Sequence, residues 1–476
     1  MSTKNLAPLN GFDEEDLNNA KLNNYAWSIG ELKDYIYVGT GKNMLLWIVN
    51  SFVERFQDFK MPIAIDVNDY NNTAEIWRYK KDNTRKWELV YKAQEGIEGI
   101  RYIISVKLNN CKNALLAVGS SNSKKNSVKI LMTYDGIIWR EVQSKNIKGT
   151  TSRTMEVYND TIYLATTVDN GEESYLYSST NPEVYGWKTL LDSSVKNFDS
   201  SKNPKGSIYN IKFFNNHLYV STSDKNGVQL WRTEGSEPEI NKWVLIADNG
   251  FGDRSNSWSL SMGTFKEHLY VSVSKQLPKA YLNPKGADLI RVDKNDNWEI
   301  VVGGEPEEPV ECSVGVRRKA VSSYESGFSN PLNVYIWQIC EYKDSLYLTT
   351  FDHGSNLQTV LEILLLNKKI LSTVIASLGI KEKSIEELIG IYKNTLKKLD
   401  KEKYQYGFDI FKSKDGINFS PLVLNGLGNN NNYGGRILFV SSENKLYIGT
   451  ANPYEGCEVW ESDNPLEILR GFNCKK

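Results

Sequence analysis

The chain has 476 residues, of which 40% are hydrophobic and 24% are charged, a composition typical of a folded globular protein. Its formal net charge is −1, so the sequence lacks the positive field that holds phosphate backbones, and nucleic acid is not an expected partner. Aromatic residues make up 12% of the chain, which favours strands, where broad side chains pack on a half-buried surface.

The beginning of the chain and its cysteines carry no targeting or redox signal. The first residues, MSTKNLAPLNGFDEEDL, contain no apolar core or cleavage site, so we expect no secretory signal. No apolar run reaches the length of about eighteen residues that a membrane span needs. Without a CxxC pair, the five cysteines predict reduced thiols in a cytoplasmic protein, with no disulfide framework and no zinc site: Cys111, Cys312, Cys340, Cys457 and Cys474.

A short strand-like stretch similar to LYVGT recurs along the whole chain. Its copies are centred on Tyr37, Ala117, Tyr163, Tyr219, Tyr270, Tyr347 and Tyr447. Before these copies the pattern predicts strands at 25–32, 100–108, 152–158, 207–214, 257–265, 334–342 and 433–440. After most copies come a short strand, such as AEIWR at Trp77, and another strand opened by an aromatic residue, such as Trp87. Each repeat therefore supplies four antiparallel strands.

Seven such repeats predict an all-β protein, a seven-bladed β-propeller of four-stranded antiparallel blades, because a blade can bury its two apolar faces only against neighbouring blades. We expect one domain over 1–476. Its blades are expected near 25–98, 99–148, 149–196, 197–254, 255–306, 307–428 and 429–476. The alternative is a tandem of smaller β-domains, which the lack of any linker disfavours.

Two hairpins carry a resemblance to a known repeat. TYDGIIW at 133–139 and SKDGINF at 413–419 place Asp-Gly between two strands, a strong hairpin signal because this turn needs positive φ. Both resemble the Asp-box turns of sialidase-like propellers, although each is one residue shorter than the pattern S-x-D-x-G-x-x-W. Asp boxes are structural turns, and the sialidase arginine, Tyr/Glu and acid residues have no counterpart set here, so the resemblance implies the fold and not the activity.

Closure of the predicted ring needs one blade that combines the two ends of the chain. APLNGF at 7–12 resembles IADNGFG at 246–252 and LVLNGLG at 422–428, each of which ends an outer strand, and LEILRGF at 466–472 resembles them too. We expect 7–12 to close the blade that begins at 429, although the sequence does not decide between the two ends.

Long insertions are predicted on a single face of the propeller. They lie at about 41–73, 274–286 and 355–405, and the link 303–332 reaches the same face. The insertions at 41–73 and 355–405 look helical, and Ser384 with Glu387 gives a helix start of the capping-box type. We expect these two insertions to form a cap over one mouth of the channel, since long structured loops on one face are commonly lids. A dimer interface is the alternative.

The innermost strands begin at that same face, and their first residues are candidate ligand contacts. Aromatic rings would supply area and guanidinium groups fixed donors, which suits a ligand with an apolar or ring body and an anionic or carbonyl group. The candidates are Trp27, Arg101, Arg153, Tyr209, Trp258, Trp337, Asn432, Tyr433 and Arg436. About half of them would face blade packing instead if the strands alternate regularly. The loop GLGNNNNYGGR at 426–436 could equally be a repeat-specific turn, since GFGDRSNSW at 250–258 echoes it.

Catalytic and metal signals are weak. Asp352 and His353, in TFDHGSN at the start of the 355–405 insertion, could serve as acid and base, with ordinary loop residues as the alternative. DVNDYNN at 66–72 lacks the glycine and terminal glutamate of a calcium loop. We find no nucleotide, hydrolase or metalloprotease motif and expect no metal or cofactor.

Three hypotheses remain open. The leading one is a cytoplasmic propeller that binds a small molecule in a capped axial pocket, with lyase, hydrolase or cyclase chemistry as an extension. The second is an interaction or oligomerisation scaffold, a homo-oligomer formed through its helical insertion. The third is a multivalent carbohydrate-binding lectin with equivalent sites between blades, which the irregular insertions disfavour.

Overall fold

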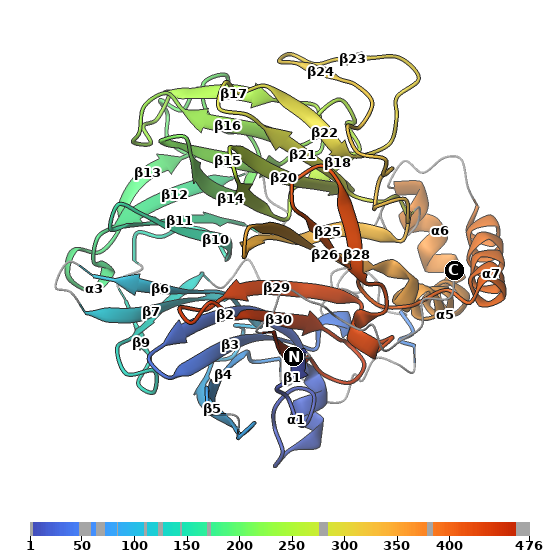
Figure 1. The fold of residues 1–476 in the computed structure, drawn as a ribbon, viewed down its shortest axis with the longest axis horizontal. Coiled ribbons are helices and arrows are strands. Elements are labelled where there is room, and N and C mark those ends of the chain that lie inside the picture. Colours follow the sequence, from blue (N-terminus) through green and yellow to red (C-terminus); the bar gives the residue numbers. More distant parts are fainter. Residues whose placement is uncertain are drawn as a thin grey trace.

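The computed structural model describes residues 3–46, 59–62, 72–82, 84–108, 112–121, 127–142, 145–168, 173–275, 284–377 and 384–462. Within them the chain is mostly β, built of antiparallel strands that pair in chain order. Much of the predicted insertion at 41–73 and part of that at 274–286 lie outside the described residues. Figure 1 shows the strands in successive twisted sheets, with the longer helices together at one side.

The first half of the chain forms sheets of four strands, in which each strand pairs with the next. They are β2 (Asn23–Leu32), β3 (Tyr35–Lys42), β4 (Glu75–Lys80) and β5 (Trp87–Lys92); β6 (Gly99–Lys107), β7 (Asn113–Ser120), β8 (Lys129–Thr133) and β9 (Arg140–Glu141); β10 (Thr151–Tyr158), β11 (Thr161–Thr167), β12 (Ser174–Ser179) and β13 (Lys188–Asp192); and β14 (Ser207–Phe214), β15 (His217–Ser223), β16 (Gln229–Thr233) and β17 (Trp243–Ala247).

The second half continues the pattern. Its sheets are β18 (Asn256–Trp258) and β19 (Met262–Phe265) with β20 (His268–Lys275), β21 (Asp288–Val292) and β22 (Trp298–Val302); β25 (Asn333–Tyr342), β26 (Ser345–Asp352), β27 (Ile410–Ser413) and β28 (Phe419–Val423); and β29 (Gly434–Val440), β30 (Leu446–Ala451) and β31 (Val459–Ser462). A separate hairpin joins β23 (Val310–Glu311) to β24 (Val316–Arg317). Short helices are α1 (Leu17–Leu22), α3 (Pro182–Tyr185) and η2 (Gly426–Gly428).

The two ends of the chain meet in the last sheet. β1 (Lys4–Asn5) pairs antiparallel with β31, and the amide of Gly11 donates to the carbonyl of Cys457 at 2.8 Å. Tyr25 in β2 and Ala451 in β30 are bridge partners, so the last sheet lies beside the first. The N-terminal segment thus supplies the outer strand of this sheet, and 463–476 lie outside the described residues.

The core lies between sheets that follow one another in the chain. One cluster packs β6–β8 against β10–β12, through Leu116, Ile130, Leu164 and Tyr177, all buried. Another packs the last sheet against the first, through Val459, Tyr447, Val38 and Trp77. Because each sheet is covered on both faces by its neighbours, no sheet has a solvated face on which the strict alternation of apolar and polar residues would appear.

Both Asp-Gly hairpins form the expected turns. Asp135 Oδ1 accepts from the amides of Ile137 and Ile138, both at 2.8 Å, and Gly136 has φ of +78°. Asp415 accepts from Ile417 and Asn418 in the same way at 2.9 and 2.8 Å. These turns are structural, because each aspartate carboxylate accepts hydrogen bonds from the backbone of its own hairpin.

The helical prediction for 355–405 is confirmed for the described part. After the short turn η1 (His353–Asn356) come α5 (Leu357–Leu366), α6 (Lys368–Ser377) and α7 (Ile385–Glu402). Ser384 caps α7 by accepting from the amide of Glu387 at 3.2 Å. The apolar faces of α5 and α7 pack together and onto Leu332. Among the described helices, none is long and apolar enough to cross a membrane.

A repeated latch joins the end of one sheet to the start of the next. In four places a glycine at positive φ is followed by Phe or Leu, and its carbonyl accepts from an asparagine that enters the next sheet. The same amide also donates to an acidic side chain of that sheet. The sets are Gly11, Asn23 and Glu75; Gly250, Asn256 and Asp288; Gly327, Asn333 and Asp409; and Gly426, Asn432 and Glu458, with distances of 2.7–3.3 Å.

Replacement of a latch asparagine by alanine should destabilise the fold. Asn256→Ala would remove the hydrogen bonds of this side chain with the Gly250 carbonyl, the Asp288 carboxylate and the Lys275 ammonium, at 3.3, 3.0 and 2.6 Å. A hydrogen bond contributes about 0.5–1.5 kcal/mol to stability, and about 1.5–3 kcal/mol where one partner is charged. Urea unfolding should therefore show a loss larger than that of the exposed control Asn295→Ala, expected within about 0.5 kcal/mol. Equal losses in the two variants would contradict a structural role for the latch.

Candidate functional site

The innermost strands share an irregularity near their first residues. In the pairing of β2 with β3, the residue between Ala26 and Ser28 has no partner. The inner strands β6, β10, β14, β25 and β29 show the same irregularity in their pairing with the next strand. The skipped residues are Trp27, Arg101, Arg153 (with Ser152), Tyr209, Trp337 and Arg436, all but Ser152 predicted ligand contacts. A β-bulge re-aims the side chain of the extra residue, so these breaks can turn large side chains out of the regular sheet faces.

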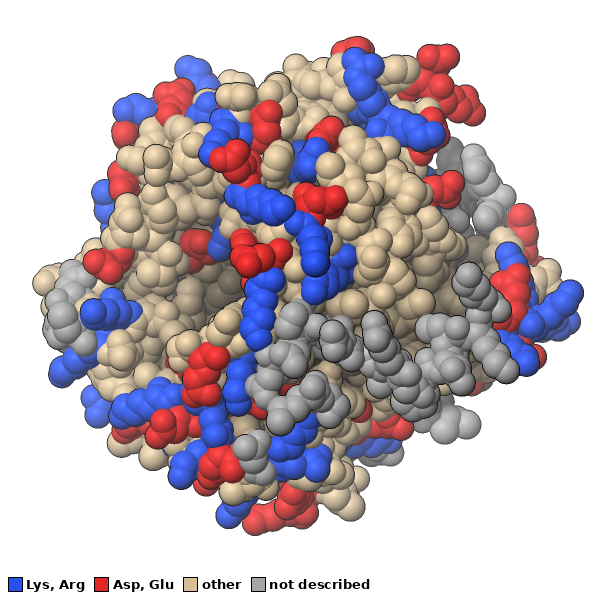
Figure 2. Space-filling view, viewed as in Figure 1, with Lys and Arg blue, Asp and Glu red and all other residues tan. Residues whose placement is uncertain are grey.

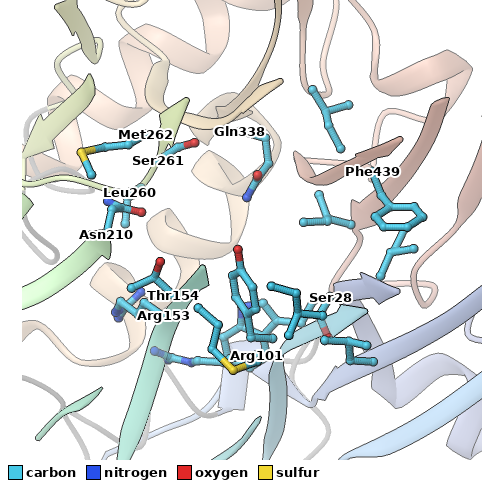
Figure 3. A pocket seen from close by; sticks show the side chains of 18 of the residues that line it. Ser28, Arg101, Arg153, Thr154, Asn210, Leu260, Ser261, Met262, Gln338 and Phe439 are labelled. Atoms are coloured by element: carbon cyan, nitrogen blue, oxygen red, sulfur yellow. The ribbon is translucent and has the colours of Figure 1, made fainter. Parts of the chain in front are cut away.

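A pocket of about 390 Å³ lies among these strands. Five predicted contacts line it: Trp27, Arg101, Arg153, Trp337 and Arg436. The remaining lining residues come from the same strands and from 260–262 at the start of β19, and include Thr154, Asn210, Leu260, Met262, Gln338 and Phe439. Figure 3 shows these side chains around a common space, with Arg101 and Arg153 close together on one side and Gln338 pointing inward.

The arginines of the pocket lie against aromatic rings. The guanidinium carbon of Arg101 is 4.6 Å from the ring centroid of Trp27, and that of Arg436 lies 5.6 Å from Trp27 and 5.2 Å from Trp337. Arg153 lies 4.2 Å from Tyr209 and 5.9 Å from Trp258. A guanidinium group over an aromatic ring is attracted by the ring quadrupole, so these rings help to fix the positions of the three arginines.

Positive charge dominates the inner end of the pocket. Burial, reinforced by the charges of Arg101 and Arg153, lowers the pKa of Arg436 to about 9. Its Nε and the indole Nε1 of neighbouring Trp27 are buried donors with no hydrogen-bond partner among the described residues. The one acidic residue in the lining, Glu156, is held by Lys212 at 2.8 Å. Such a site is electrostatically suited to an anion.

The outer surface has a different charge pattern. Figure 2 shows Lys and Arg interspersed with Asp and Glu over the face drawn, with large neutral areas between them. The clustering of arginine in the pocket is therefore a local feature and does not reflect the composition of the chain, whose net charge is −1.

The pocket extends away from the helical side of the molecule. The helices follow β26, whose last residue Asp352 pairs with Asn333 at the start of β25, whereas the pocket takes Trp337, Gln338 and Ile339 from further along β25. At the helical end the described residues form a buried aromatic cluster that includes Tyr25, Tyr335, Phe351 and Tyr433. At the other end the lining reaches Ser105, which is exposed. The described helices therefore do not cover this opening of the pocket. The predicted cap stays a prediction, because much of its 41–73 insertion lies outside the described residues.

Four predicted contacts do not line the pocket. Tyr209 and Trp258 lie behind it as stacking partners of Arg153. The hydroxyl of buried Tyr433 forms a short hydrogen bond with that of Tyr25, whose pKa burial raises to about 12. Asn432 is a latch residue that donates to Gly426 and Glu458, both at 2.9 Å. The loop GLGNNNNYGGR is thus a repeat-specific turn in this part.

Asp352 and His353 also lie outside the pocket lining, and both are fully buried. Asp352 accepts from the amides of Gly354 and Gly407 and the hydroxyl of Tyr404, at 2.8–2.9 Å. The Nε2 atom of His353 is 3.5 Å from Tyr392 Oη in α7. Their role in this structure is to attach the helical segment to the end of β26.

Several lining residues were absent from the prediction, among them Gln338, Met262 and Phe439. Gln338 and Phe439 lie one and three residues after a bulged position, and Met262 begins β19, so the same strand segments would have revealed these residues if both faces of each strand had been considered. No group of three or more His, Cys, Asp or Glu side chains able to hold a metal ion occurs among the described residues.

Comparison with known proteins identifies similar architectures but no family. No protein-family model and no curated protein matches the chain, and no sialidase repeat is identified. Among solved structures, the chain is similar to Saccharomyces cerevisiae Sqt1, at 11% identity and a TM-score of 0.44 over 98% of this chain and 100% of that one. It is similar to the polysaccharide lyase Uly1, at 10% identity and a TM-score of 0.46 over 92% of this chain and 90% of that one.

A third similar structure is the acylaminoacyl peptidase of Pyrococcus horikoshii, at 7% identity and a TM-score of 0.42, covering 92% of this chain and 51% of the peptidase. These structural neighbours are β-propeller proteins. At such low identity, the activities of these proteins say nothing about the ligand or activity of this one.

Proposed function

We propose that the chain is a seven-bladed β-propeller that binds a small organic anion in its axial pocket. The observation that carries the proposal is the convergence of Arg101, Arg153 and Arg436 on one pocket, with a buried Arg436 Nε that has no partner among the described residues. Holding like charges together in a buried site is unfavourable, and a bound anion would relieve it.

The chemistry of the lining defines the class of ligand. An anionic group such as carboxylate, sulfonate or phosphate accepts from guanidinium edges at the inner end. An aromatic or aliphatic body then packs on the apolar residues of the lining, which include Ile103, Leu260, Met262, Ile437 and Phe439. A volume of about 390 Å³ is at the small end of the range for ligand pockets, roughly 300–1,000 Å³. The ligand enters from the end opposite the helices.

The proposal predicts charge-selective binding that depends on Arg436. Isothermal titration should show one site for phenyl phosphate or benzoate and much weaker binding of benzyl alcohol, which has the same ring without the charge. Arg436→Gln should weaken anion binding at least about 30-fold, or about 2 kcal/mol, because a buried charge partner is lost. The exposed control Arg318→Gln removes the same charge outside the pocket and should leave affinity unchanged. Equal affinity for benzoate and benzyl alcohol would exclude the anion site.

The natural ligand can be sought directly. Native mass spectrometry of the protein purified from its own host should show an additional small mass that is lost on denaturation. The same preparation of Arg436→Gln should lack that mass. A bound mass that persists in the variant would place the ligand elsewhere in the molecule.

A further inference from the structure

The latch beneath the helical segment differs from its equivalents in one respect. In β2–β3 and β18–β20, the residue opposite the latch asparagine is a lysine, Lys42 or Lys275. Lys42 Nζ contacts the acid of its latch, Glu75, at 3.0 Å, and Lys275 Nζ donates to Asn256 Oδ1 at 2.6 Å. In β25–β26 the same position opposite Asn333 is occupied by Asp352.

Two aspartates therefore belong to this latch. Asp409 is almost fully buried and accepts from Asn333 Nδ2 at 2.7 Å, and the charge of Asp352 acts on it. No described cation forms an ion pair with either aspartate, and Asn333 Oδ1 is a buried acceptor with no partner among the described residues. The donor that Lys42, Lys275 or Asn452 supplies in the other latches is thus missing here.

A proton on Asp409 is the simplest replacement for that donor. Both oxygens of Asp352 already accept from the Gly354, Gly407, Tyr404 and Ser355 donors, which favours its ionised form. Asp409 has fewer donors, and a protonated carboxyl group can pair with an amide by accepting from its nitrogen and donating to its oxygen. We propose that Asp409 keeps a proton near neutral pH and that this proton makes the anchoring of the α5–α7 segment pH-dependent.

The link to the helices passes through Asp352. Tyr404 and Gly407, which follow α7, donate to Asp352 at 2.8 and 2.9 Å, and the amide of Phe408 donates to the carbonyl of Asn432 at 2.9 Å. The other ionisable groups around the pair are Asp400, Tyr404 and Tyr406 from the α7 end, and His353, whose ring faces Tyr392. Ionisation of Asp409 would add a second negative charge at the base of this segment.

The direction of the pH effect follows from the two titrations. Burial and the charge of Asp352, partly offset by the Asn333 bond, raise the pKa of Asp409 to about 8, and burial raises that of Asp352 to about 6. An exposed aspartate titrates near about 4. The anchored form therefore holds more protons than the open form, and its stability falls as the pH rises through this window. Between pH 6 and pH 8 the fall is due mainly to Asp409.

Hydrogen exchange of residues 385–408, corrected for intrinsic rates, tests the proposal. Protection in the wild-type protein should fall at least tenfold between pH 6 and pH 8. Asp409→Asn, which supplies a permanent donor, should remove this dependence, whereas the exposed control Asp160→Asn should behave as wild type. A flat profile in the wild type, or the same slope in Asp409→Asn, would overturn the proposal.

An infrared titration of the wild-type protein provides a second test that needs no variant to fold. A protonated carboxyl C=O band should be present at pH 7 and disappear as the pH is raised through about 8. If the wild-type spectrum lacks this band at pH 7, Asp409 holds no proton and the proposal is wrong. The experiment does not depend on the axial pocket or its ligand.

Discussion

Replacement of Lys42 by methionine is expected to lower the free energy of unfolding by about 3–5 kcal/mol. The ammonium group of Lys42 and the carboxylate of Glu75 are both fully buried, at 3.0 Å. Methionine retains most of the side-chain volume but removes the charge, so the buried Glu75 carboxylate would lose the cation that it contacts. Urea unfolding of the wild type and the variant at pH 7 measures the loss.

The double variant Lys42→Met/Glu75→Gln separates the charge from the packing. Glutamine can still accept from Asn23 and Trp77, which donate to Glu75 Oε2 at 3.0 and 2.9 Å, and leaves no uncompensated charge. We expect it to recover at least half of the loss, since replacing both members of a buried ion pair is much less costly than removing one. If the double variant is as unstable as Lys42→Met, the loss comes from packing and not from charge.

The features that sequence predicted well are those fixed by short segments. The Asp135 and Asp415 turns, the Ser384 cap and the strand pairs depend on residues within a few positions of each other. The repeat alignment also placed several inner-strand residues at equivalent positions in successive repeats, and five of them line one pocket: Trp27, Arg101, Arg153, Trp337 and Arg436. The blade count remains part of the proposal.

The features that sequence missed depend on contacts between distant segments. Alternation along a strand gives no sign of a bulge, so the position of Trp27 or Arg436 relative to the sheet face could not be derived. The glycines and asparagines of 426–436 suggested a ligand loop, whereas the six-residue spacing of Gly426 and Asn432, repeated at 250 and 256 and at 327 and 333, is the spacing of the latch. That spacing was the available signal.

The end of the inner strands beside the helices illustrates the same limit. The sequence placed the helices and the start of the inner strands on one face, and the helices do begin at the end of β26 beside the start of β25. It could not show that Tyr25, Tyr335, Phe351 and Tyr433 pack together at that end, because these residues come from separate strands and the adjoining loop. The pocket extends from the arginines in the opposite direction.

The stability of ligand-free Arg436→Gln should distinguish a binding arginine from a structural one. Burial and two neighbouring arginines disfavour the charged form of Arg436, so removing the charge should raise the free energy of unfolding by about 1–2 kcal/mol, after allowance for lost stacking on Trp27 and Trp337. Arg317→Gln provides the control, because Arg317 is buried and contacts Asp288 at 2.9 Å, and its loss should cost about 3–5 kcal/mol. Urea unfolding without ligand gives both values. If Arg436→Gln is destabilised as much as Arg317→Gln, the guanidinium group of Arg436 stabilises the fold. If Arg436→Gln raises the free energy of unfolding while Arg317→Gln lowers it, the protein retains an unfavourable charge in its pocket that serves ligand binding.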